Sequence, residues 1–237
     1  MRIALMVLRK LYLVPYAFLR LWWVSIHYDG NYEKGYKRSK FIAKHGIDAG
    51  NITLEVHGEE NVPKEDGFIY YPNHQGLFDV LTFLYTSPKP FAFVIKHEIK
   101  KVFLLKQVIA ATGSLPMDRD DIRQSMQVIN QVAKEVKEGR NYLIFAEGTR
   151  SRNGNQLLDF KGGSFKAAQK AKCPIVPCAL IDSFIPFDEN SVRQVTVKLI
   201  YLPPMYYEEY KDMKTTEIAD EVKKRIEAAI AEYGSSN

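Results

Sequence analysis

Residues 68–79 read FIYYPNHQGLFD and join an apolar run of strand length to a polar loop. Four consecutive apolar residues bounded by turn-forming residues are typical of a buried strand. A polar loop that follows such a strand is where α/β folds place reacting groups. This stretch therefore predicts an α/β fold with chemistry at one edge of its sheet.

Similar patterns recur outward from this stretch. Residues 52–56 alternate apolar and polar side chains, as a half-buried strand does. Further strand-length apolar runs lie at residues 91–95, 142–145 and 175–181, and Val195, Val197 and Leu199 predict a late strand. One-sided apolar spacing predicts helices over residues 122–136 and, near the end of the chain, over about 216–233. Strands that alternate with helices predict an α/β domain with a central, mostly parallel sheet flanked by helices.

The first 27 residues predict a separate apolar element. Residues 11–26 read LYLVPYAFLRLWWVSI, which is apolar except for Arg20 and shorter than the ~20 residues of a spanning helix. Pro15 favours the start of a second short helix, and tryptophans favour the level of lipid headgroups. We expect two helices over residues 1–27 that dock on a membrane, followed by an α/β domain over residues 28–237. The alternative is a pair of core helices packed on the domain.

The join between these parts is a polar, glycine-containing stretch. Residues 28–35 read YDGNYEKG and form the one convincing linker in the chain. A short basic helix over residues 36–43 follows it.

Composition limits the class of protein. The 237 residues suffice for one substantial domain with its own core. The net charge of +5 fits attraction to anionic lipids or phosphate compounds, and alone it does not separate these from nucleic acid. Cys173 and Cys178 are the only cysteines, too few for a disulfide framework and wrongly spaced for zinc. We expect both to be buried and reduced, in a protein on the cytoplasmic face of the cell membrane.

The polar loop in residues 73–79 contains a candidate acid–base pair. His74 and Asp79 are five residues apart, so on one regular helix they would point in different directions. They can meet if His74 precedes the first helical turn, and Gly76 eases such an entry. The carboxylate would then bind one ring nitrogen and leave the other as a base. The alternative is a structural histidine beside a helix-capping aspartate.

A second polar loop follows the run at residues 142–145 and reads AEGTRSR (residues 146–152). Gly148 permits close backbone approach, Thr149 offers a hydroxyl, and Arg150 offers a planar pair of donors. These groups suit a phosphate, although the loop is neither a Walker loop nor a dinucleotide fingerprint. The alternative is a polar turn with a surface ion pair.

Two more cations follow predicted strands. Lys96 comes directly after the run at 91–95, and Arg119 comes after the stretch GSLPMD at 113–118. The carboxyl ends of parallel strands meet at one edge of a sheet. Four such ends therefore bring a His/Asp pair, two arginines and a lysine to the same edge, and this combination favours a functional site.

The segments NHQGLFD, GSLPMDR, FAEGTRS and PIVPCAL, in this order, resemble the four motifs of the glycerophospholipid acyltransferase family. Within this family the chain looks most like bacterial 1-acyl-glycerol-3-phosphate acyltransferases. The resemblance runs from about Val56 to Leu180, and the apolar N-terminal helices resemble a membrane-docking element of some members. Ala146 departs from the proline usual in the family, which removes no reacting group.

The resemblance implies a function. A fatty acyl group would pass from acyl-CoA or acyl carrier protein to the free hydroxyl of 1-acyl-glycerol 3-phosphate (lysophosphatidic acid), giving phosphatidic acid for phospholipid synthesis. His74 would be the general base and Asp79 would fix its tautomer. The implied residues around the acceptor phosphate are Lys96, Arg119, Glu147, Gly148, Thr149 and Arg150. No cofactor, metal or nucleic acid is expected.

Three rival functions share some of these features. An acyltransferase for glycerol 3-phosphate or another lysophospholipid would have the same catalytic core. A hydrolase could use His74 and Asp79 to activate water, although the chain has no Gly-x-Ser-x-Gly elbow. A non-catalytic membrane or nucleic-acid binding module could use the basic surface, although no base-stacking aromatic platform is evident. The sequence leaves the donor, the chain length and the oligomeric state open.

Overall fold

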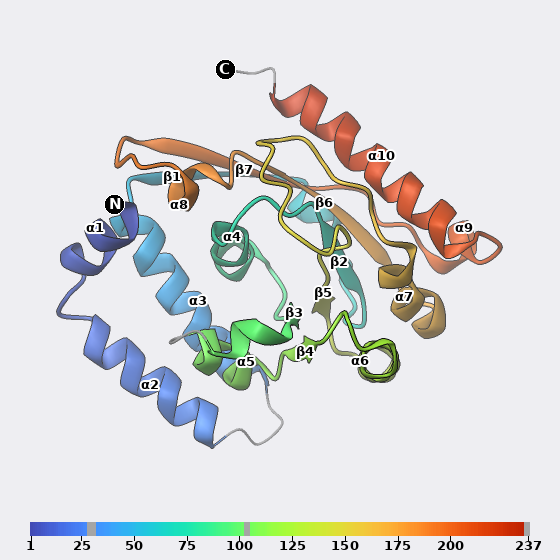
Figure 1. The fold of residues 1–237 in the computed structure, drawn as a ribbon, viewed down its shortest axis with the longest axis horizontal. Helices are drawn as coiled ribbons and strands as arrows, with labels where there is room; N and C mark the ends of the chain where they lie inside the picture. Colours follow the sequence, from blue (N-terminus) through green and yellow to red (C-terminus); the bar gives the residue numbers. More distant parts are fainter. Residues whose placement is uncertain (28–31, 102–104, 235–237) are drawn as a thin grey trace.

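The structure is a computed structural model that describes residues 1–27, 32–101 and 105–234. Seven strands form one sheet in the order β1-β7-β6-β2-β5-β3-β4 (Figure 1). The strands are β1 Ile52–His57, β2 Ile69–Pro72, β3 Ala92–Lys96, β4 Leu115–Met117, β5 Tyr142–Leu143, β6 Ile175–Ile181 and β7 Val195–Tyr201. All neighbours pair in parallel except β6 and β7. The predicted α/β fold with a mostly parallel sheet is confirmed.

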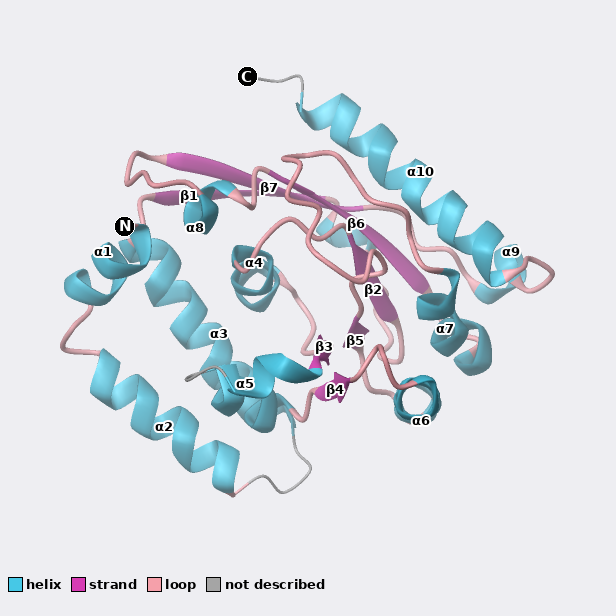
Figure 2. Ribbon diagram, viewed as in Figure 1, coloured by secondary structure: helices cyan, strands magenta, loops and turns pink. Residues whose placement is uncertain are grey.

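Helices cover both faces of this sheet (Figure 2). The α-helices are α1 Arg2–Arg9, α2 Val14–Ile26, α3 Tyr32–Ala49, α4 Phe78–Thr86, α5 Leu105–Thr112, α6 Ile122–Lys137, α7 Lys166–Ala171, α8 Ile185–Asp188, α9 Tyr207–Tyr210 and α10 Thr215–Gly234. Short 3-10 turns lie at Glu59–Asn61, His97–Lys101 and Gly162–Phe165. The helices predicted from one-sided apolar spacing correspond to α6 and α10.

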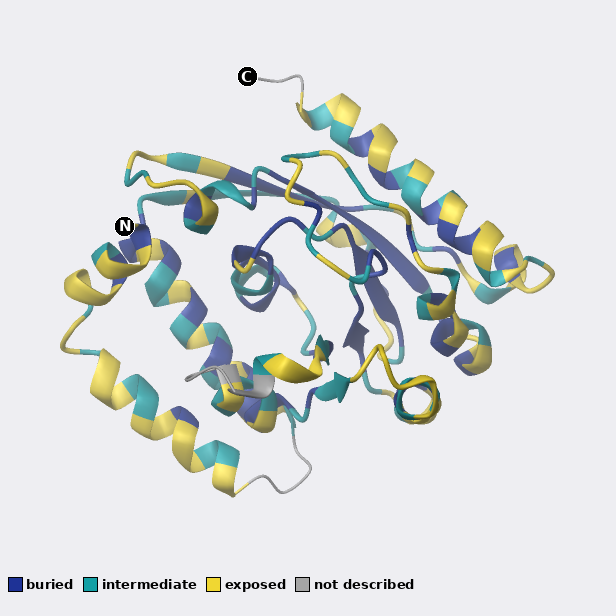
Figure 3. Cartoon of the chain, viewed as in Figure 1, coloured by how far each residue is buried: buried dark blue, intermediate teal, exposed yellow. Residues whose placement is uncertain are grey.

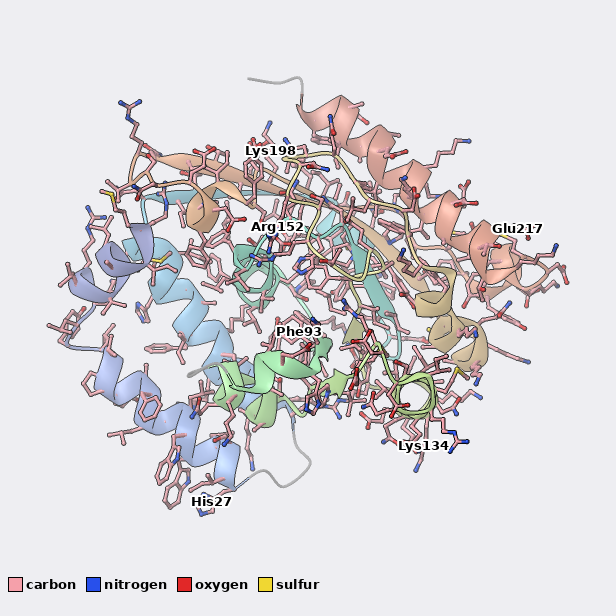
Figure 4. All side chains as sticks on the ribbon, in the orientation of Figure 1. His27, Phe93, Lys134, Arg152, Lys198 and Glu217 are labelled. Atoms are coloured by element: carbon pink, nitrogen blue, oxygen red, sulfur yellow. The ribbon has the colours of Figure 1, made fainter. Side chains whose placement is uncertain are left out.

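Side chains of β6 alternate between two apolar layers, because successive residues of a strand face opposite sides of its sheet. Ile175 and Ala179 lie in one layer with α6, α7 and α10. Val176 and Leu180 lie in the other layer with α3 and α4. Figure 3 shows the buried strands between these helices. Lys198 of β7 is also buried, and its Nζ donates to a carbonyl in the last turn of α10 at 2.8 Å, which holds that helix on the sheet (Figure 4).

The second half of the predicted linker is helical. Residues 28–31 of this stretch lie outside the described residues, and α3 begins at Tyr32. The basic helix expected over residues 36–43 is part of this longer helix. Gly35 lies inside α3 because that helix packs closely on α5: a Cβ here would lie 1.7 Å from the carbonyl oxygen of Ala111. The glycine marks a close helix contact, which its sequence neighbours do not reveal.

The first two helices are present, and Pro15 lies in the first turn of α2 as expected. None of the helices within the described residues is long and apolar enough to cross a membrane. Both helices contact the domain: α1 packs on α3, and α2 packs on α3 and α5. Met6 and Leu21 are buried in these contacts. Packing therefore crosses the boundary that the sequence predicts after residue 27.

Two arginines tie α1 to the carboxyl end of α3. Arg2 is 2% exposed and donates to the carbonyl oxygens of Gly50, at 2.6 Å, and Arg193, at 2.8 Å. Arg9 donates to the carbonyl oxygen of Ala49 at 3.0 Å. Cations beside the last carbonyls of a helix also offset the negative end of its dipole. A buried arginine held in this way makes α1 a structural part of the domain.

We expect Arg2→Ala to lower the free energy of unfolding by about 2–3 kcal/mol, because hydrogen bonds from a charged group to buried carbonyls are lost. Urea unfolding followed by circular dichroism measures this change. Lys37→Ala is the matched control, since its side chain is 78% exposed and forms only a loose pair with Glu33. Equal stability of the two variants would show that α1 is only loosely held.

Candidate active site

The loop after β2 is fixed on the neighbouring strand by Asn73. This side chain is buried, donates from Nδ2 to the carbonyl oxygen of Leu180 at 3.0 Å, and accepts from the Leu180 N–H at 2.7 Å. Both backbone groups belong to β6, which pairs with β2. The next residue, His74, therefore leaves the sheet from a rigid position.

His74 and Asp79 meet directly. His74 Nδ1 lies 2.7 Å from Asp79 Oδ2, and the carboxylate is fully buried. A carboxylate only accepts hydrogen bonds, so this contact assigns the ring proton to Nδ1. Nε2 then carries a lone pair, and no group of the described residues hydrogen-bonds to it. The ring is 18% exposed, so a ligand can reach this nitrogen.

Asp79 also organises the backbone around the histidine. Its Oδ2 accepts from the N–H groups of Gln75, at 2.7 Å, and Gly76, at 3.0 Å. It lies in the first turn of α4, where the helix dipole favours a negative charge. The expected role of Gly76 differs in detail, because this residue does not have a left-handed backbone. A Cβ here would lie 3.3 Å from the Cα of Phe184, so the glycine allows the loop to pack closely on this residue.

Glu147 joins the histidine loop to the loop that follows β5. Its Oε1 accepts from the His74 N–H at 2.6 Å, and its Oε2 accepts from the Leu158 N–H at 3.0 Å. The Ser151 N–H donates in turn to the carbonyl oxygen of His74 at 2.8 Å. Burial raises the pKa of the Glu147 carboxyl, while the two backbone hydrogen bonds act in the opposite direction. Glu147 is thus a brace between the two loops.

Phe145 gives the histidine ring its second contact. The two rings stack, with centroids 3.9 Å apart and planes inclined by 20°. The strand predicted over residues 142–145 ends at Leu143, and the chain then turns so that the Gly148 N–H donates to the Phe145 carbonyl oxygen. Gly148 has a φ of +79°, which side chains disfavour, and this explains the glycine in the loop. Ala146 holds the turn through its carbonyl oxygen, which accepts from the Lys161 N–H at 2.8 Å.

The three predicted cations lie in different surroundings. Lys96 pairs with Glu98 at 2.8 Å, and both side chains are more than half exposed. Arg150 lies 3.9 Å from Asp188 of α8. Arg119 has no ion pair of its own among the described residues, and burial lowers the pKa of its guanidinium against a smaller opposing effect of Glu98. Neighbouring strand ends bring Lys96 and Arg119 near one carboxylate, whereas Arg150 turns towards α8.

A cavity of about 460 Å³ opens beside His74, between α6 and the ends of β3, β4 and β5. Five residues singled out by the two loops and by β4 line it: Arg119, Phe145, Glu147, Gly148 and Thr149. Its remaining wall is largely apolar. His74 itself does not line the cavity, but two of the lining residues contact it: Phe145 stacks on its ring, and Glu147 accepts from its backbone N–H. Lys96 and Arg150 do not line this cavity.

Neither cysteine is a nucleophile of this site. Both thiols are free and buried, as the sequence predicts. Burial raises the pKa of Cys173 to about 12 and that of Cys178 well above its ordinary value, so neither forms a thiolate at neutral pH. No group of three or more metal-binding side chains gathers anywhere in the described part of the chain.

Sequence reasoning did not identify the residues that orient this site. Asn73, Gln75 and Phe145 stand inside the quoted motifs without an assigned role, and Asp188 lies outside them. Gln75 is buried and binds the loop that follows β5 through Asn155, at 2.7 Å. The only sequence signal that pointed to Gln75 was its position as a polar residue next to His74, the candidate base. Figure 4 shows where the loop lies in the centre of the molecule, around the labelled Arg152.

Comparison with known proteins gives a consistent result. The sequence model of the acyltransferase family matches residues 53–181. The 1-acyl-sn-glycerol-3-phosphate acyltransferase of Borreliella burgdorferi is 32% identical over 182 residues, which cover 74% of this chain and 72% of that protein. A chloroplastic 1-acyl-sn-glycerol-3-phosphate acyltransferase of Brassica napus is 29% identical over 73% of this chain and 49% of its own length.

A solved structure has a similar fold. It is the 1-acyl-sn-glycerophosphate (LPA) acyltransferase PlsC from Thermotoga maritima, with a TM-score of 0.80 and 21% identity. The similarity covers 100% of this chain and 99% of that chain. The N-terminal helices therefore lie within the shared fold.

Proposed function

Because the chain belongs to the acyltransferase family, we propose that it transfers a fatty acyl group from a thioester to the free hydroxyl of 1-acyl-glycerol 3-phosphate. The product is phosphatidic acid, a precursor of phospholipids. The donor is acyl-CoA or acyl carrier protein. The observation that supports this most directly is the contact of His74 Nδ1 with the buried Asp79 carboxylate, which leaves Nε2 free to act as a base.

His74 is the general base in this proposal. Nε2 removes the proton from the acceptor hydroxyl while the hydroxyl oxygen bonds to the thioester carbonyl carbon. The tetrahedral intermediate then collapses, the carbon–sulfur bond breaks, and the leaving thiol receives the proton from His74. Asp79 stabilises the imidazolium between these steps. Transfer is direct, since the two thiols are buried with raised pKa values and the described residues offer no other activated nucleophile.

Lys96 and Arg150 bind the acceptor phosphate. Their present partners, Glu98 and Asp188, are at least a third exposed, and exposed ion pairs contribute only about 0–1 kcal/mol. A charge-assisted hydrogen bond to phosphate is worth roughly 1.5–3 kcal/mol. The acceptor phosphate can therefore replace Glu98 and Asp188 as the partner of each cation. Glu147 positions the loop that carries Arg150, with Gly148 and Thr149 next to it.

Residues 1–27 dock the enzyme on the cytoplasmic face of the cell membrane as a peripheral or monotopic protein. Twelve of the sixteen large exposed hydrophobic side chains among the described residues lie in residues 1–26. Trp23 is 60% exposed, and Arg20 lies over the ring of Tyr16 at 5.3 Å. Exposed apolar side chains with aromatic and cationic neighbours suit the membrane interface. The acceptor is a lipid, so a docked enzyme does not need to draw it into water.

We expect His74→Ala to reduce transfer to lysophosphatidic acid by about two to four orders of magnitude, because the base is lost. Asp79→Ala should leave a trace of activity. Steady-state transfer assays measure both, and thermal melting checks that each variant is folded. Wild-type turnover by folded His74→Ala would refute the assignment of the base.

Lys96→Ala and Arg150→Ala should each raise the Michaelis constant for the lysophosphatidic acceptor by about tenfold or more, because a charge-assisted bond to phosphate is lost. The constant for the donor should change little. Lys224→Ala removes an exposed charge from α10 and serves as the control. A change in the donor constant alone would contradict an acceptor role.

Leu19→Glu with Trp23→Glu should abolish flotation with anionic vesicles, because two charges then lie on the exposed apolar side of α2. The control places two charges at exposed positions of α6 and α10, Gln127→Glu and Ala228→Glu. A flotation assay measures the fraction of each double variant that binds the vesicles. Docking through α2 is wrong if the first variant still floats like the control.

A further inference from the structure

One buried glutamine joins the loops that follow β2, β5 and β6, and the proposed mechanism does not use its side chain. Gln75 is 1% exposed, and its Oε1 accepts from the Ser183 N–H at 2.8 Å. Its Nε2 donates to Asn155 Oδ1 at 2.7 Å and to the Gly154 carbonyl oxygen at 3.3 Å. Ser183 follows β6, whereas Gly154 and Asn155 follow β5. A side-chain amide suits this position because it has an acceptor for one loop and donors for the other.

Asn155 continues this connection to Asp182. The Asp182 N–H donates to Asn155 Oδ1 at 2.9 Å, and Asn155 Nδ2 donates to Asp182 Oδ1 at 2.9 Å. Asp182 has a φ of +60°, a left-handed conformation that aspartate and asparagine adopt more readily than most residues with side chains. We call Gln75, Asn155 and Asp182 the loop clamp. Its hydrogen bonds hold the segments after β5 and β6 to each other and to the loop that carries His74.

The two segments that the loop clamp holds also carry Arg150 and its acidic partner. Arg150 lies in the segment after β5, close to the labelled Arg152 in the chain, and Asp188 lies in α8, which follows Asp182 (Figure 4). Arg150 Nη1 and Asp188 Oδ1 are 3.9 Å apart, and both side chains are about a third exposed. Ion pairs of this kind contribute little free energy. The place of Arg150 therefore depends mainly on how its backbone segment is held.

His74 has supports that do not include the side chains of the loop clamp. Asn73 binds the backbone of β6, and Phe145 stacks on the histidine ring. Asp79 accepts from the backbone N–H of Gln75 rather than from its side chain. A change in the clamp side chains removes none of these contacts. It should therefore displace the phosphate-binding arginine more than the base.

We propose that Gln75, Asn155 and Asp182 are positioning residues that place Arg150 for the phosphate of the acceptor. This inference rests on the proposed function, in which Arg150 binds that phosphate. The loop clamp then favours acceptors that carry a phosphate, because it holds the cation in a constant position relative to His74. A weakened clamp raises the Michaelis constant for such an acceptor and leaves the turnover number and the constant for the donor almost unchanged.

The test exchanges one atom of the clamp. Asn155→Asp replaces the Nδ2 donor with an oxygen, so that two carboxylates lie at hydrogen-bond distance and repel each other. We expect the Michaelis constant for lysophosphatidic acid to rise about fivefold or more, because part of a charge-assisted bond to phosphate is lost. Gln75→Leu removes the other donor to Asn155 Oδ1 and should raise the same constant. Steady-state transfer assays measure the effects, and thermal melting checks that both variants are folded.

A second substitution should reverse the effect. Asp182→Asn in the Asn155→Asp protein exchanges the amide and the carboxylate, so a donor again faces an acceptor across the clamp. Asparagine also tolerates the left-handed backbone at this position. We expect the constant for lysophosphatidic acid to return most of the way to the wild-type value. A folded double variant that keeps the full defect of Asn155→Asp overturns the inference.

A control makes the result specific to the loop clamp. Asn153→Asp makes the same chemical change at an exposed position of the same segment and should leave the constant for lysophosphatidic acid unchanged. An equal rise in Asn153→Asp would indicate a general effect of added negative charge near the phosphate, and it would overturn the inference.

The kinetic pattern separates this inference from the proposed function. If the clamp variants lose only thermal stability or only turnover, the inference is wrong and transfer to lysophosphatidic acid stands. If wild type acylates glycerol 3-phosphate instead, the proposed acceptor is wrong, and the same comparison made with glycerol 3-phosphate tests the clamp. If wild type acylates neither, binding of lysophosphatidic acid measured by calorimetry replaces the Michaelis constant, and equal affinities of wild type and Asn155→Asp overturn the inference.

Discussion

The buried carboxylate of Asp79 is the interaction on which the rest of the site depends. One oxygen accepts from the His74 ring and from the backbone N–H groups of Gln75 and Gly76. A buried carboxylate that lacked such donors would be strongly destabilised in its charged form. The first turn of α4 supplies a favourable helix dipole as well. The contacts that orient the base are therefore the same contacts that shape the entry into α4.

Glu147 links the loop that carries His74 to the loop that follows a second strand, β5. Because β2 and β5 are neighbours in the sheet, the loops that follow them lie side by side, and Glu147 bridges them through backbone N–H groups. Phe145 stacks on the ring of His74 from the same loop. On our proposal the acceptor phosphate meets Lys96, at the end of β3, and Arg150, in the loop that follows β5.

The N-terminal helices combine two roles that the sequence treats as alternatives. Buried Arg2 and Met6 attach α1 to the domain, as core helices would be attached. Leu19 and Trp23 on α2 remain exposed, as a docking surface requires. An interfacial helix needs a rigid attachment if it is to hold the site at a fixed height above the membrane. We expect the attachment to act through α1 and the lipid contact mainly through α2.

The fold class, most strands, the two long amphipathic helices and the motifs around His74 and Glu147 could all be predicted from the sequence. These features depend on patterns within a few residues, which the periodicity of strands and helices makes readable. Three other facts became visible only in the folded chain: Gly35 lies inside a helix against Ala111, Arg2 is buried, and Arg119 rather than Arg150 lines the cavity. Each of these facts depends on a contact between residues far apart in the chain. Such contacts are set by how whole elements pack, and no local pattern of side chains records them.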